Sequence, residues 1–581
     1  MVTVANDKVH ERIILLRRYL PQIEQPTGWS LRAKLYKEVL GLDYDWPKSI
    51  EELAARISDE QLVEIFKLSP YREYYSFRGR FYTVKNGELR LQDSWGEVKN
   101  AIWEAFKLNG LKAYALLKAL LELGETPFAA AAARAGEIIG TRFNAAQVLA
   151  ELRDRWELVW ESGGAREKMW VIPEEIRPVV EEFIKTVESK PLPRLSTRHS
   201  EEEFVRILEM EAEYDSYLHV LVSERLEETM RFGKSFGVKS LVDYLVDLFG
   251  PEIFFDELLT LAQQYSLSDT AVVTESGHKS MSTGFNLALF GEPGTGKTFA
   301  TKDFILGNES MGVLPHGLPG VNRYCGGITP AMFIAIGEAY SGRKFNFIVP
   351  EFNDWFRYKG MVEPLKLAME GGVIAYETKA YRVGPYKFTS YFSVNYNTKV
   401  YERGYEVTVS DPNFNAIEDR MLCRLHRLTK EKYRELAESQ KRLMLGITTQ
   451  KMKKMAPRIR DHLTLVHAIQ TGNAKVKDFK PKDILLTEKE LKLIENAREL
   501  ILEHIPASSI LPFSMRLERR AIQLASALTL VSYFQFDSPY MTIDHEALVL
   551  AARFYVEEAW IRLRESFPLG EVLRKLEKTS L

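Results

Sequence analysis

The spacing of apolar residues along this chain changes several times, and each change marks a different kind of predicted structure. Apolar residues three or four positions apart, the spacing of amphipathic helices, dominate residues 1–110 and 201–280 and return after residue 430. Between these helical parts, residues 285–290 and 345–349 form unbroken apolar runs, which are typical of buried parallel strands. The pattern therefore predicts a multidomain α/β plus α chain with a parallel sheet near its middle.

The first of these apolar runs leads into a glycine-rich loop, GEPGTGKT, which ends at Lys297 and Thr298. Its spacing is that of a P-loop, in which backbone amides surround phosphates, the lysine reaches the terminal phosphates and the threonine hydroxyl binds Mg2+. A helix-like stretch follows, and its N-terminal end favours an anion. The sequence therefore predicts ATP and Mg2+ as cofactors, with Thr298 as the metal ligand. The predicted nucleotide contacts are Gly291, Glu292, Pro293, Gly294, Thr295, Gly296, Lys297 and Thr298.

The second apolar run is followed at once by Pro350 and Glu351. A carboxylate that follows a parallel strand lies at the edge where such sheets place their chemistry. Glu351 is therefore the predicted general base, which polarises a water for attack on the γ-phosphate. The alternative interpretation is a surface glutamate in a loop.

The N-terminal part contains one hairpin signal and one recognisable order of elements. The segments RFYTV and ELRLQ flank Asn86 and Gly87, a pair that favours a tight turn between two strands. From residue 111 onward, three helix-like stretches precede a β-ribbon, and this order resembles a winged-helix domain. Its third helix, at about 144–156, would be the recognition helix. Its charges are mixed, so contact with DNA and contact with protein remain equally open.

Breaks in the pattern divide the chain into six parts. Two prolines and a polar cluster interrupt strong helical patterns near residues 187–200, as expected of a linker. We expect an N-terminal mostly helical region at 1–110, a winged-helix-like domain at 111–186, the linker at 187–200, a helical lead-in at 201–280, the nucleotide-binding domain at 281–430 and a C-terminal helical lid at 431–581.

Composition limits the class of protein. Of the 581 residues 45% are hydrophobic and 27% charged, and no apolar run approaches the length of a membrane span. The N-terminal stretch lacks the order of a signal peptide, so we expect an intracellular protein, cytoplasmic or nucleoid-associated, with no membrane partner. Cys325 and Cys423 are the only cysteines, which excludes a disulfide framework or a cysteine zinc site. The net charge of -2 means that nucleic acid would have to bind through local basic features.

The order of the motifs resembles that of the AAA+ ATPases with a helix-2 insert. After the P-loop come a GITPA helix, the strand that ends in PEFND, EPLKLAMEGGVIAYETKAYRVG, FTSYFSVNYN and AIEDRMLCRL. Within that group the chain is most similar to the minichromosome maintenance (MCM) helicases, with MoxR-type ATPases close behind. The resemblance covers about residues 285–430, with a weaker match at 510–560. It implies an AAA+ fold for the nucleotide domain, ATP hydrolysis and a homo-oligomeric ring of hexameric type.

The resemblance also implies roles for individual residues. Glu351 would correspond to the Walker B glutamate, and Asn395 to the sensor 1 amide that orients the attacking water. Arg420 would be the arginine finger that reaches into a neighbouring subunit's ATP, and Arg516 resembles the sensor 2 arginine of the lid. The family places an aspartate before the Walker B glutamate, where this chain has Pro350; Asp354 could substitute, or hydrolysis could be slow.

Two predicted hairpins could connect the nucleotide to a substrate. Residues 373–383 would be the helix-2 insert, and residues 399–409 match the pre-sensor-1 hairpin. In ring ATPases of this type such hairpins face the central channel, where cations would contact a DNA backbone. The alternative is that these are solvated turn charges. The predicted DNA contacts are Lys379, Arg382, Lys399 and Arg403.

Three functions are consistent with these features. The first is an ATP-driven DNA motor of MCM-like helicase or translocase type, which the winged helix favours. The second is a MoxR-like ATPase that remodels a protein client. The third is an ATP-switched, initiator-like DNA-binding protein with weak hydrolysis, which Pro350 suggests.

Overall fold

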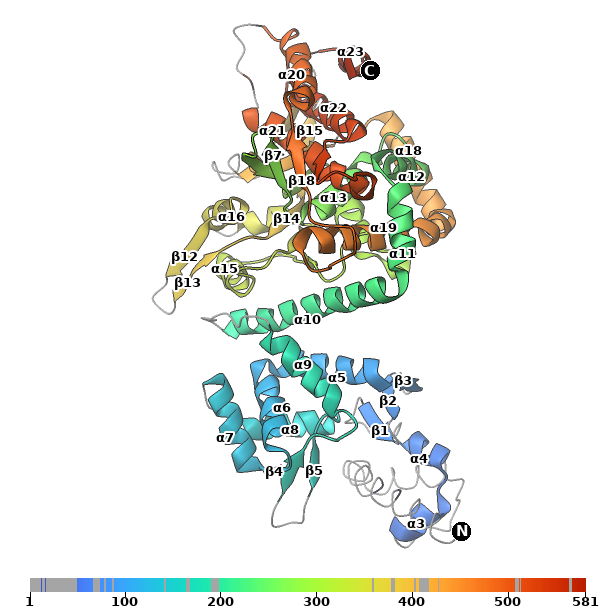
Figure 1. Cartoon of the computed structure of the whole chain (residues 1–581), viewed down its shortest axis with the longest axis vertical. Coiled ribbons are helices and arrows are strands. Elements are labelled where there is room, and N and C mark those ends of the chain that lie inside the picture. The colour runs from blue at the N-terminus through green and yellow to red at the C-terminus, as the bar shows by residue number, and fades with distance from the viewer. Residues whose placement is uncertain are drawn as a thin grey trace. The chain divides into compact units, whose positions relative to one another are not determined.

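The chain folds into two compact units, Met1–Leu192 and Pro193–Leu581, in a computed structural model (Figure 1). The predicted linker at 187–200 includes the end of α9 (Arg177–Glu188), the division between the units and the start of α10 (Arg198–Val220). The structure describes residues 12, 16, 50–65, 74–77, 80–85, 88–92, 94–140, 143–162, 168–189, 198–357, 360–377, 382–401, 404–406, 417–426, 428–506, 511, 514–563 and 567–580.

The first unit begins with short helices and an antiparallel sheet. Two helices, α3 (Ile50–Arg56) and α4 (Asp59–Ile65), precede the strands β1 (Tyr74–Phe77), β2 (Arg80–Lys85) and β3 (Glu88–Gln92). Strands β2 and β3 pair antiparallel, with Lys85 opposite Glu88, which confirms the predicted hairpin. The predicted turn residues Asn86 and Gly87 lie outside the described residues.

The rest of this unit has the predicted order of three helices and a β-ribbon. A third short strand joins the ribbon, and the strand order is β4-β6-β5. Helix α5 packs on α9 through Trp103 and Phe183, whose ring centroids are 5.2 Å apart. The segments on either side of residue 110 therefore share one core. The elements are α5 (Ser94–Asn109), α6 (Leu111–Leu123), β4 (Thr126–Pro127), α7 (Phe128–Ile139), α8 (Ala145–Asp154), β5 (Trp160–Ser162) and β6 (Met169–Val171).

A five-stranded parallel sheet forms the centre of the second unit, as the apolar runs predicted. Its strand order is β10-β11-β14-β9-β17, so β14 separates the two strands recognised as apolar runs, β9 and β11. All residues of β9 and β11 are buried. Because the strands are parallel, their carboxyl ends share one edge. The strands are β9 (Asn286–Gly291), β10 (Asn322–Tyr324), β11 (Asn346–Val349), β14 (Tyr391–Asn397) and β17 (Met421–Leu425).

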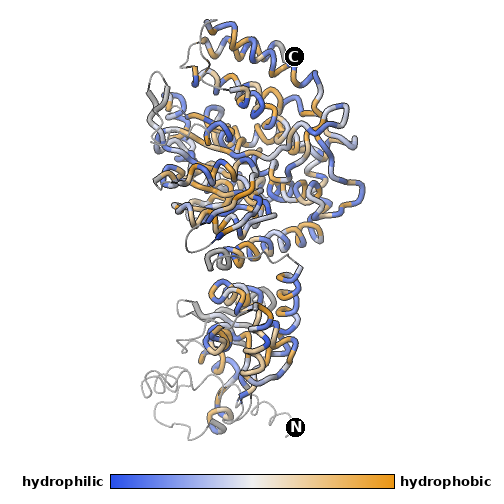
Figure 2. The backbone as a smooth tube through the Cα atoms, turned by 90° about the vertical axis from the view of Figure 1, so that its left-hand side faces the viewer, coloured by the Kyte–Doolittle hydropathy of each residue, from blue (hydrophilic) through white to orange (hydrophobic). Residues whose placement is uncertain are grey.

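Helix α13 (Phe255–Ser266), which the sequence placed in a lead-in segment, belongs to this core. All of its residues are buried. The Gln263 amide donates hydrogen bonds to the backbone carbonyls of Phe285 and Phe392, at 3.2 and 2.6 Å, and so joins α13 to the segments of β9 and β14. Figure 2 shows apolar stretches meeting at the centre of this unit.

A second sheet corrects the prediction that the part after residue 430 is entirely helical. Its strand order is β19-β18-β7-β8, in which β18 and β19 come from the C-terminal part. These two strands span only four and three residues, too few for a clear period-two pattern. The strands are β7 (Ala271–Thr274), β8 (Lys279–Ser282), β18 (Asp483–Leu486) and β19 (Tyr540–Thr542).

Helices of the C-terminal part pack with the central sheet in one apolar core. Leu287 and Leu289 of β9 belong to the same buried cluster as Leu524 and Leu528 of α21. The helices are α18 (Lys430–Met444), α19 (Ile447–Thr471), α20 (Glu488–Leu502), α21 (Met515–Thr529), α22 (His545–Arg562) and α23 (Leu569–Ser580). The predicted parts 201–280, 281–430 and 431–581 therefore form one compact unit.

Both predicted hairpins of this unit are present. The first consists of β12 (Val373–Glu377) and β13 (Arg382–Lys387), and the second of β15 (Lys399–Tyr401) and β16 (Gly404–Glu406). Their turns lie outside the described residues. Across the described parts of the chain, no helix has the length and apolar character needed to span a membrane.

Candidate functional site at the carboxyl edge of the central sheet

The glycine-rich loop between β9 and the following helix has the backbone that its glycines require. Gly294 and Gly296 have φ values of 83° and 91°, a region that other residues rarely adopt. Gly291 is needed for space as well, because an added Cβ would lie 2.7 Å from Cβ of His426. The loop then enters a helix whose first turns form the π-helix η4 (Phe299–Asp303). The spacing of the glycines thus has a direct physical reason.

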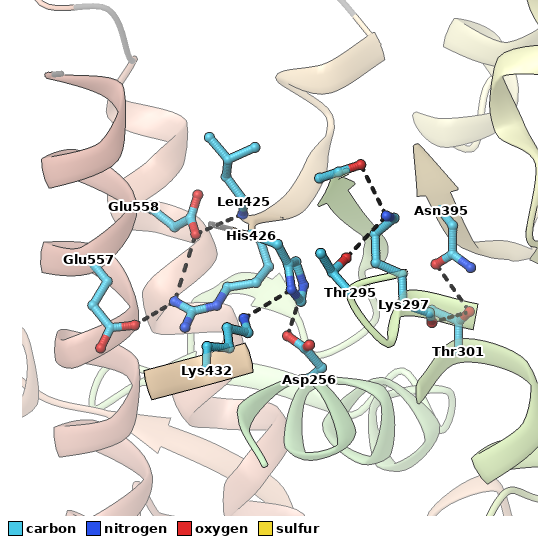
Figure 3. Close-up of polar contacts among 12 residues, drawn as sticks. Asp256, Thr295, Lys297, Thr301, Asn395, Leu425, His426, Lys432, Glu557 and Glu558 are labelled. Carbon is cyan, nitrogen blue, oxygen red and sulfur yellow. Dashed lines mark hydrogen bonds and ion pairs between the residues drawn. The ribbon is translucent and has the colours of Figure 1, made fainter. Parts of the chain in front are cut away.

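Lys297 points its ammonium group back into this loop (Figure 3). Its Nζ donates to the carbonyls of Gly291 and Glu292, at 3.0 and 2.6 Å, and to Oγ1 of Thr295, at 3.2 Å. These acceptors carry no formal charge. The side chain is buried, and this desolvation lowers the pKa of Lys297 to about 8. An oxygen-rich anion would suit such a buried, loop-facing cation.

Asn395 meets the P-loop helix from the neighbouring strand β14. Its Nδ2 donates to Oγ1 of Thr298 over 3.3 Å, and its Oδ1 accepts from the hydroxyl of Thr301 over 3.1 Å. Figure 3 shows Asn395 and Thr301 side by side. The sequence predicted Asn395 as a site residue, and the structure brings it to the predicted magnesium ligand. The sequence pattern did not point to Thr301.

Glu351 lies two residues after the end of β11, at the same edge of the sheet. Its side chain is exposed, and its Oε2 accepts from Nδ2 of Asn397 over 3.4 Å. Asn397 is held in turn by Asn353, which donates to its carbonyl at 3.0 Å and accepts from its backbone N–H at 2.8 Å. The Asn353 side chain thus makes the two backbone hydrogen bonds with Asn397 that a neighbouring strand would make if β11 continued further. The sequence segments EFND and NYN contain Asn353 and Asn397, but no pattern in them indicates a function. Only the hydrogen bonds between the two residues show that they hold the partner of Glu351 in place.

The resemblance places an aspartate of the metal shell at position 350, directly before Glu351. Asp354 lies four residues beyond that position. It belongs to the 3-10 helix η6 (Phe352–Arg357), and its backbone N–H donates to the carbonyl of Glu351 over 3.1 Å. Pro350 occupies the turn between β11 and this helix. The structure thus places Asp354 one turn beyond the position directly before Glu351.

A buried network of charged side chains lies beside the P-loop. His426 follows β17, and its Nε2 lies 3.1 Å from Oδ1 of Asp256 in α13. Its Nδ1 accepts a hydrogen bond from Nζ of Lys432 in α18, at 3.0 Å (Figure 3). Burial lowers the pKa of His426 to about 4, so the ring is neutral at pH 7. The lysine contact assigns the remaining ring proton to Nε2, which faces Asp256.

The neighbouring residues of β17 connect this network to α22. Arg424 contacts the carboxylate of Glu557, and Oε1 of Glu558 accepts from the backbone N–H of Leu425 at 3.1 Å (Figure 3). Glu558 is fully buried, and burial raises its pKa to about 7. The edge strand beside the P-loop strand is therefore held to a C-terminal helix by charged groups that sequence patterns did not identify.

An open cavity of about 410 Å³ lies between residues 246–251 and helix α18. Phe249 on its wall lies against Phe299, with ring centroids 5.6 Å apart. Leu436 of α18 closes over the loop, since an added Cβ on Gly296 would lie 3.5 Å from its Cδ2. The lining residues are Val246, Asp247, Phe249, Gly250, Pro251, Glu435, Glu438 and Arg442.

Arg420 and Arg516 lie at the opposite edge of the sheet from the P-loop. Arg420 precedes β17, whereas the P-loop follows β9, and the two strands run parallel with Met421 opposite Asn286. Five residues of strand separate the two edges, or about 17 Å. Neither arginine therefore joins the P-loop of its own chain.

These two arginines line a second cavity, of about 670 Å³, together with Arg519, Arg520 and Lys344. Arg420 donates through Nε to Oε1 of Glu370 at 2.8 Å, and Arg516 donates to Oδ2 of Asp419 at 2.6 Å. Arginines outnumber the carboxylates that hold them in this cavity wall, which also includes Asp269. This edge of the sheet is thus suited to an anionic group.

The predicted DNA contacts are only partly within the described residues. Arg382 is exposed and forms an ion pair with Glu377 across its hairpin, at 2.8 Å. Lys399 begins β15, and Lys379 and Arg403 lie outside the described residues.

Two described cations of the predicted winged-helix domain are matched by carboxylates. Arg153, on the predicted recognition helix α8, contacts Asp154 and Glu161. Lys168 also pairs with Glu161, at 2.6 Å. These contacts compete with any phosphate that approaches the helix.

The two cysteines, Cys325 and Cys423, are free and buried. Over the described residues, no group of three or more histidine, cysteine or carboxylate side chains could hold a metal ion. No protein-family model matches the sequence, and no curated protein matches it.

Proposed function

We propose that this protein is an ATP-binding ATPase of the AAA+ type. One observation carries the proposal: three segments far apart in the sequence meet at one edge of a parallel sheet. They bring a buried P-loop lysine, a strand-end carboxylate and an amide together, as Lys297, Glu351 and Asn395. An ATPase needs these three groups, for phosphate binding, water activation and orientation of the reacting groups.

Each residue of this edge has a role in that reaction. The loop amides and Lys297 would hold the phosphates, and Thr298 would supply a hydroxyl ligand to Mg2+. The metal, when bound, neutralises charge on the phosphate oxygens. Asn395 presents an NH2 group beside Thr298, and Glu351 accepts a proton from the attacking water. Pro350 leaves the metal shell without the usual aspartate, which predicts slow turnover.

The base of the nucleotide would lie in the cavity whose wall includes Phe249, the ring neighbour of Phe299 on the P-loop helix. Phe249 supplies an aromatic wall, and Leu436 of α18 lies over Gly296. The cavity volume of about 410 Å³ is in the range of small-molecule sites.

The site requires a second copy of the chain. Arg420 and Arg516 are held at the opposite edge of the sheet, in a cavity suited to an anion. In a head-to-tail ring this edge would meet a neighbour's P-loop, where the arginines stabilise charge on the transferred phosphoryl group. In a ring of hexameric type, the arginine edge of every subunit would contact the P-loop edge of the next subunit.

We further propose that the ring is a DNA motor of MCM-like helicase or translocase type, in which the two hairpins contact DNA. The second candidate is a MoxR-like remodelling ATPase, which the carboxylate-matched cations Arg153 and Lys168 favour. An ATP-switched, initiator-like protein is the third, and Pro350 favours it.

The decisive test measures ATP hydrolysis by the purified full-length protein. We expect Lys297→Ala to abolish binding and hydrolysis, and Glu351→Gln to preserve binding but lower kcat by 100-fold or more, on the order expected for a general base. Lys302→Ala is the matched control, because Lys302 lies on the same helix and pairs with Asp303. Unchanged hydrolysis in Glu351→Gln would contradict the proposed mechanism.

The same assay separates the candidate functions. Stimulation by single- or double-stranded DNA that declines with salt supports the motor. Hydrolysis without any response to DNA supports the remodelling ATPase, and nucleotide binding without turnover supports the switch.

A further inference from the structure

The hydroxyl of Thr301 contacts the Asn395 amide on the side that faces the protein core. Both side chains are buried, with 0% and 1% of their surface exposed. The hydroxyl of Thr301 donates to Oδ1 of Asn395 over 3.1 Å, while Nδ2 of the same amide donates to Oγ1 of Thr298 over 3.3 Å. The amide thus lies between two threonines of the P-loop helix, Thr301, which is buried, and Thr298, which is at the site.

An asparagine amide has a donor end and an acceptor end, and only one of them suits phosphate. With its NH2 group toward Thr298, Asn395 offers hydrogen bonds to phosphate oxygens or to the attacking water. With its carbonyl oxygen toward the same place, it would repel phosphate. The direction of this amide therefore decides whether Asn395 can assist hydrolysis.

The Thr301 hydroxyl has a single proton and two acceptors within reach. Besides Oδ1 of Asn395, the carbonyl of Lys297 lies 3.0 Å from the same Oγ1. When the proton points to Asn395, the amide must direct Oδ1 inward and NH2 toward the site. When it points to the Lys297 carbonyl, the hydroxyl can only accept from the amide, which would then turn its oxygen toward the site.

The local backbone supports a special role for this position. Thr301 lies within the π-helix η4, where the backbone N–H of Phe304 donates to the carbonyl of Phe299. Short π-helical turns occur mostly inside α-helices and are frequent at functional sites.

We propose that Thr301 is a positioning residue, which holds the Asn395 amide with its NH2 group toward Thr298 and the bound phosphates. This inference rests on the proposed ATPase function. Thr301 does not touch the nucleotide and acts only through Asn395.

The test uses single-turnover ATP hydrolysis by the full-length protein in excess over ATP, so that slow variants remain measurable. We expect Thr301→Val, of nearly equal shape, to lower the hydrolysis rate by roughly 10-fold, on the order of one lost buried hydrogen bond, with ATP affinity unchanged. Thr301→Ser should restore the rate to within about twofold of the wild type, because it restores the hydroxyl.

Thr464→Val is the matched control for packing and stability. Thr464 is equally buried, and its hydroxyl donates to the carbonyl four residues earlier, the position at which Thr301 has the Lys297 carbonyl within reach, but Thr464 lies in α19. We expect Thr464→Val to leave the hydrolysis rate unchanged below its thermal transition.

A double-mutant cycle distinguishes positioning from a general structural effect. In the Asn395→Ala background, Thr301→Val should have no further effect on the rate. A rate loss of the same size in both backgrounds, or no loss in either, would overturn the inference while leaving the ATPase proposal intact. Absence of hydrolysis in the wild type would overturn the proposed function itself.

Discussion

At the residue scale, Lys297 shows how burial prepares a cation for an anion. Its ammonium group is removed from water and bound only by carbonyl and hydroxyl oxygens of its own loop. Desolvation therefore lowers the pKa of Lys297 to about 8, although the charges of Asp256, Glu351 and Glu292 oppose the shift. A bound polyphosphate would restore the missing counter-charge.

This lowered pKa predicts that nucleotide affinity depends on pH in a range where most lysines remain charged. Below about pH 8 Lys297 carries its proton, which is the form that would bind phosphate in the proposed site. As pH rises above that value the free protein loses the proton, so ATP affinity should fall by up to about tenfold per pH unit. Isothermal titration calorimetry with a non-hydrolysable ATP analogue, between pH 7 and 9.5, measures this effect.

Two observations check the assignment to Lys297. Binding should be accompanied by proton uptake near pH 8.5, seen as a binding enthalpy that changes with the ionisation enthalpy of the buffer. Affinity that stays constant from pH 7 to 9.5 would show that Lys297 keeps an ordinary pKa.

At the element scale, buried polar and charged groups join β17 to α22. Glu558 accepts from the Leu425 backbone, and Arg424 contacts Glu557. Because β17 pairs with the P-loop strand β9, this attachment sets the position of α22 relative to the site. Burial raises the pKa of Glu558 to about 7, from an ordinary value of 4.5.

The raised pKa has a defined effect on stability. The folded state binds the Glu558 proton more tightly than the unfolded state, so its contribution is fully present below about pH 4.5 and is lost as pH rises through about 7. The glutamine in Glu558→Gln cannot titrate, so the free energy of unfolding of this variant should lack this part of the pH dependence. The slope of that part is at most about 1.4 kcal/mol per pH unit. Urea unfolding at several pH values between 4.5 and 8 measures the difference.

Glu546→Gln is the control for this comparison, because Glu546 is exposed on the same helix. Its stability should follow the wild type at every pH. If Glu558→Gln does so too, the carboxyl group of Glu558 is ionised in the folded protein throughout this range.

At the scale of the whole molecule, the two edges of the central sheet carry complementary halves of the proposed site. Lys297 and Glu351 lie at the carboxyl edge, and Arg420 and Arg516 lie at the other. In the proposed site one chain would not bring the two halves together, because a strand length separates them.

Mixing two inactive variants tests whether the halves come from different copies. We expect Lys297→Ala and Arg420→Ala proteins, each inactive alone, to recover partial hydrolysis when mixed, because some interfaces combine an intact Lys297 with an intact Arg420. The matched control mixes Lys297→Ala with Glu351→Gln. Both of these changes lie at the same edge, so every interface contains a defect and no recovery is expected.

Recovery in the first mixture but not in the second requires a site shared between copies. If neither mixture recovers activity although the variants assemble, Arg420 does not act in a neighbour's site.

Local patterns in the sequence were sufficient for most of the elements. Continuous apolar runs predicted β9 and β11, and turn residues predicted the hairpins at β2–β3 and β15–β16. Alternating apolar and polar residues predicted the hairpin at β12–β13. Thr329 and Pro330 begin α15 (Pro330–Ala339), and the Thr329 hydroxyl oxygen caps it by accepting from the backbone N–H of Met332. These predictions succeed because each depends on residues a few positions apart.

Only the tertiary structure decided which of these elements are neighbours. Strand β14 lies between β9 and β11, which brings Asn395 to Thr298 and reveals Thr301 beside it. The network of Asp256, His426 and Lys432 also joins segments with no common pattern in the sequence.

The sequence by itself determined the P-loop, because steric freedom at its glycines and the chemistry of Lys297 and Thr298 are properties of the residues themselves. It also determined the alternation of helical and strand segments, which follows from apolar spacing. The tertiary structure decided the order of strands in the sheet, the buried partners of each site residue and the separation of Arg420 from Lys297. These features depend on pairing between distant segments, which is set by the packing of the whole core.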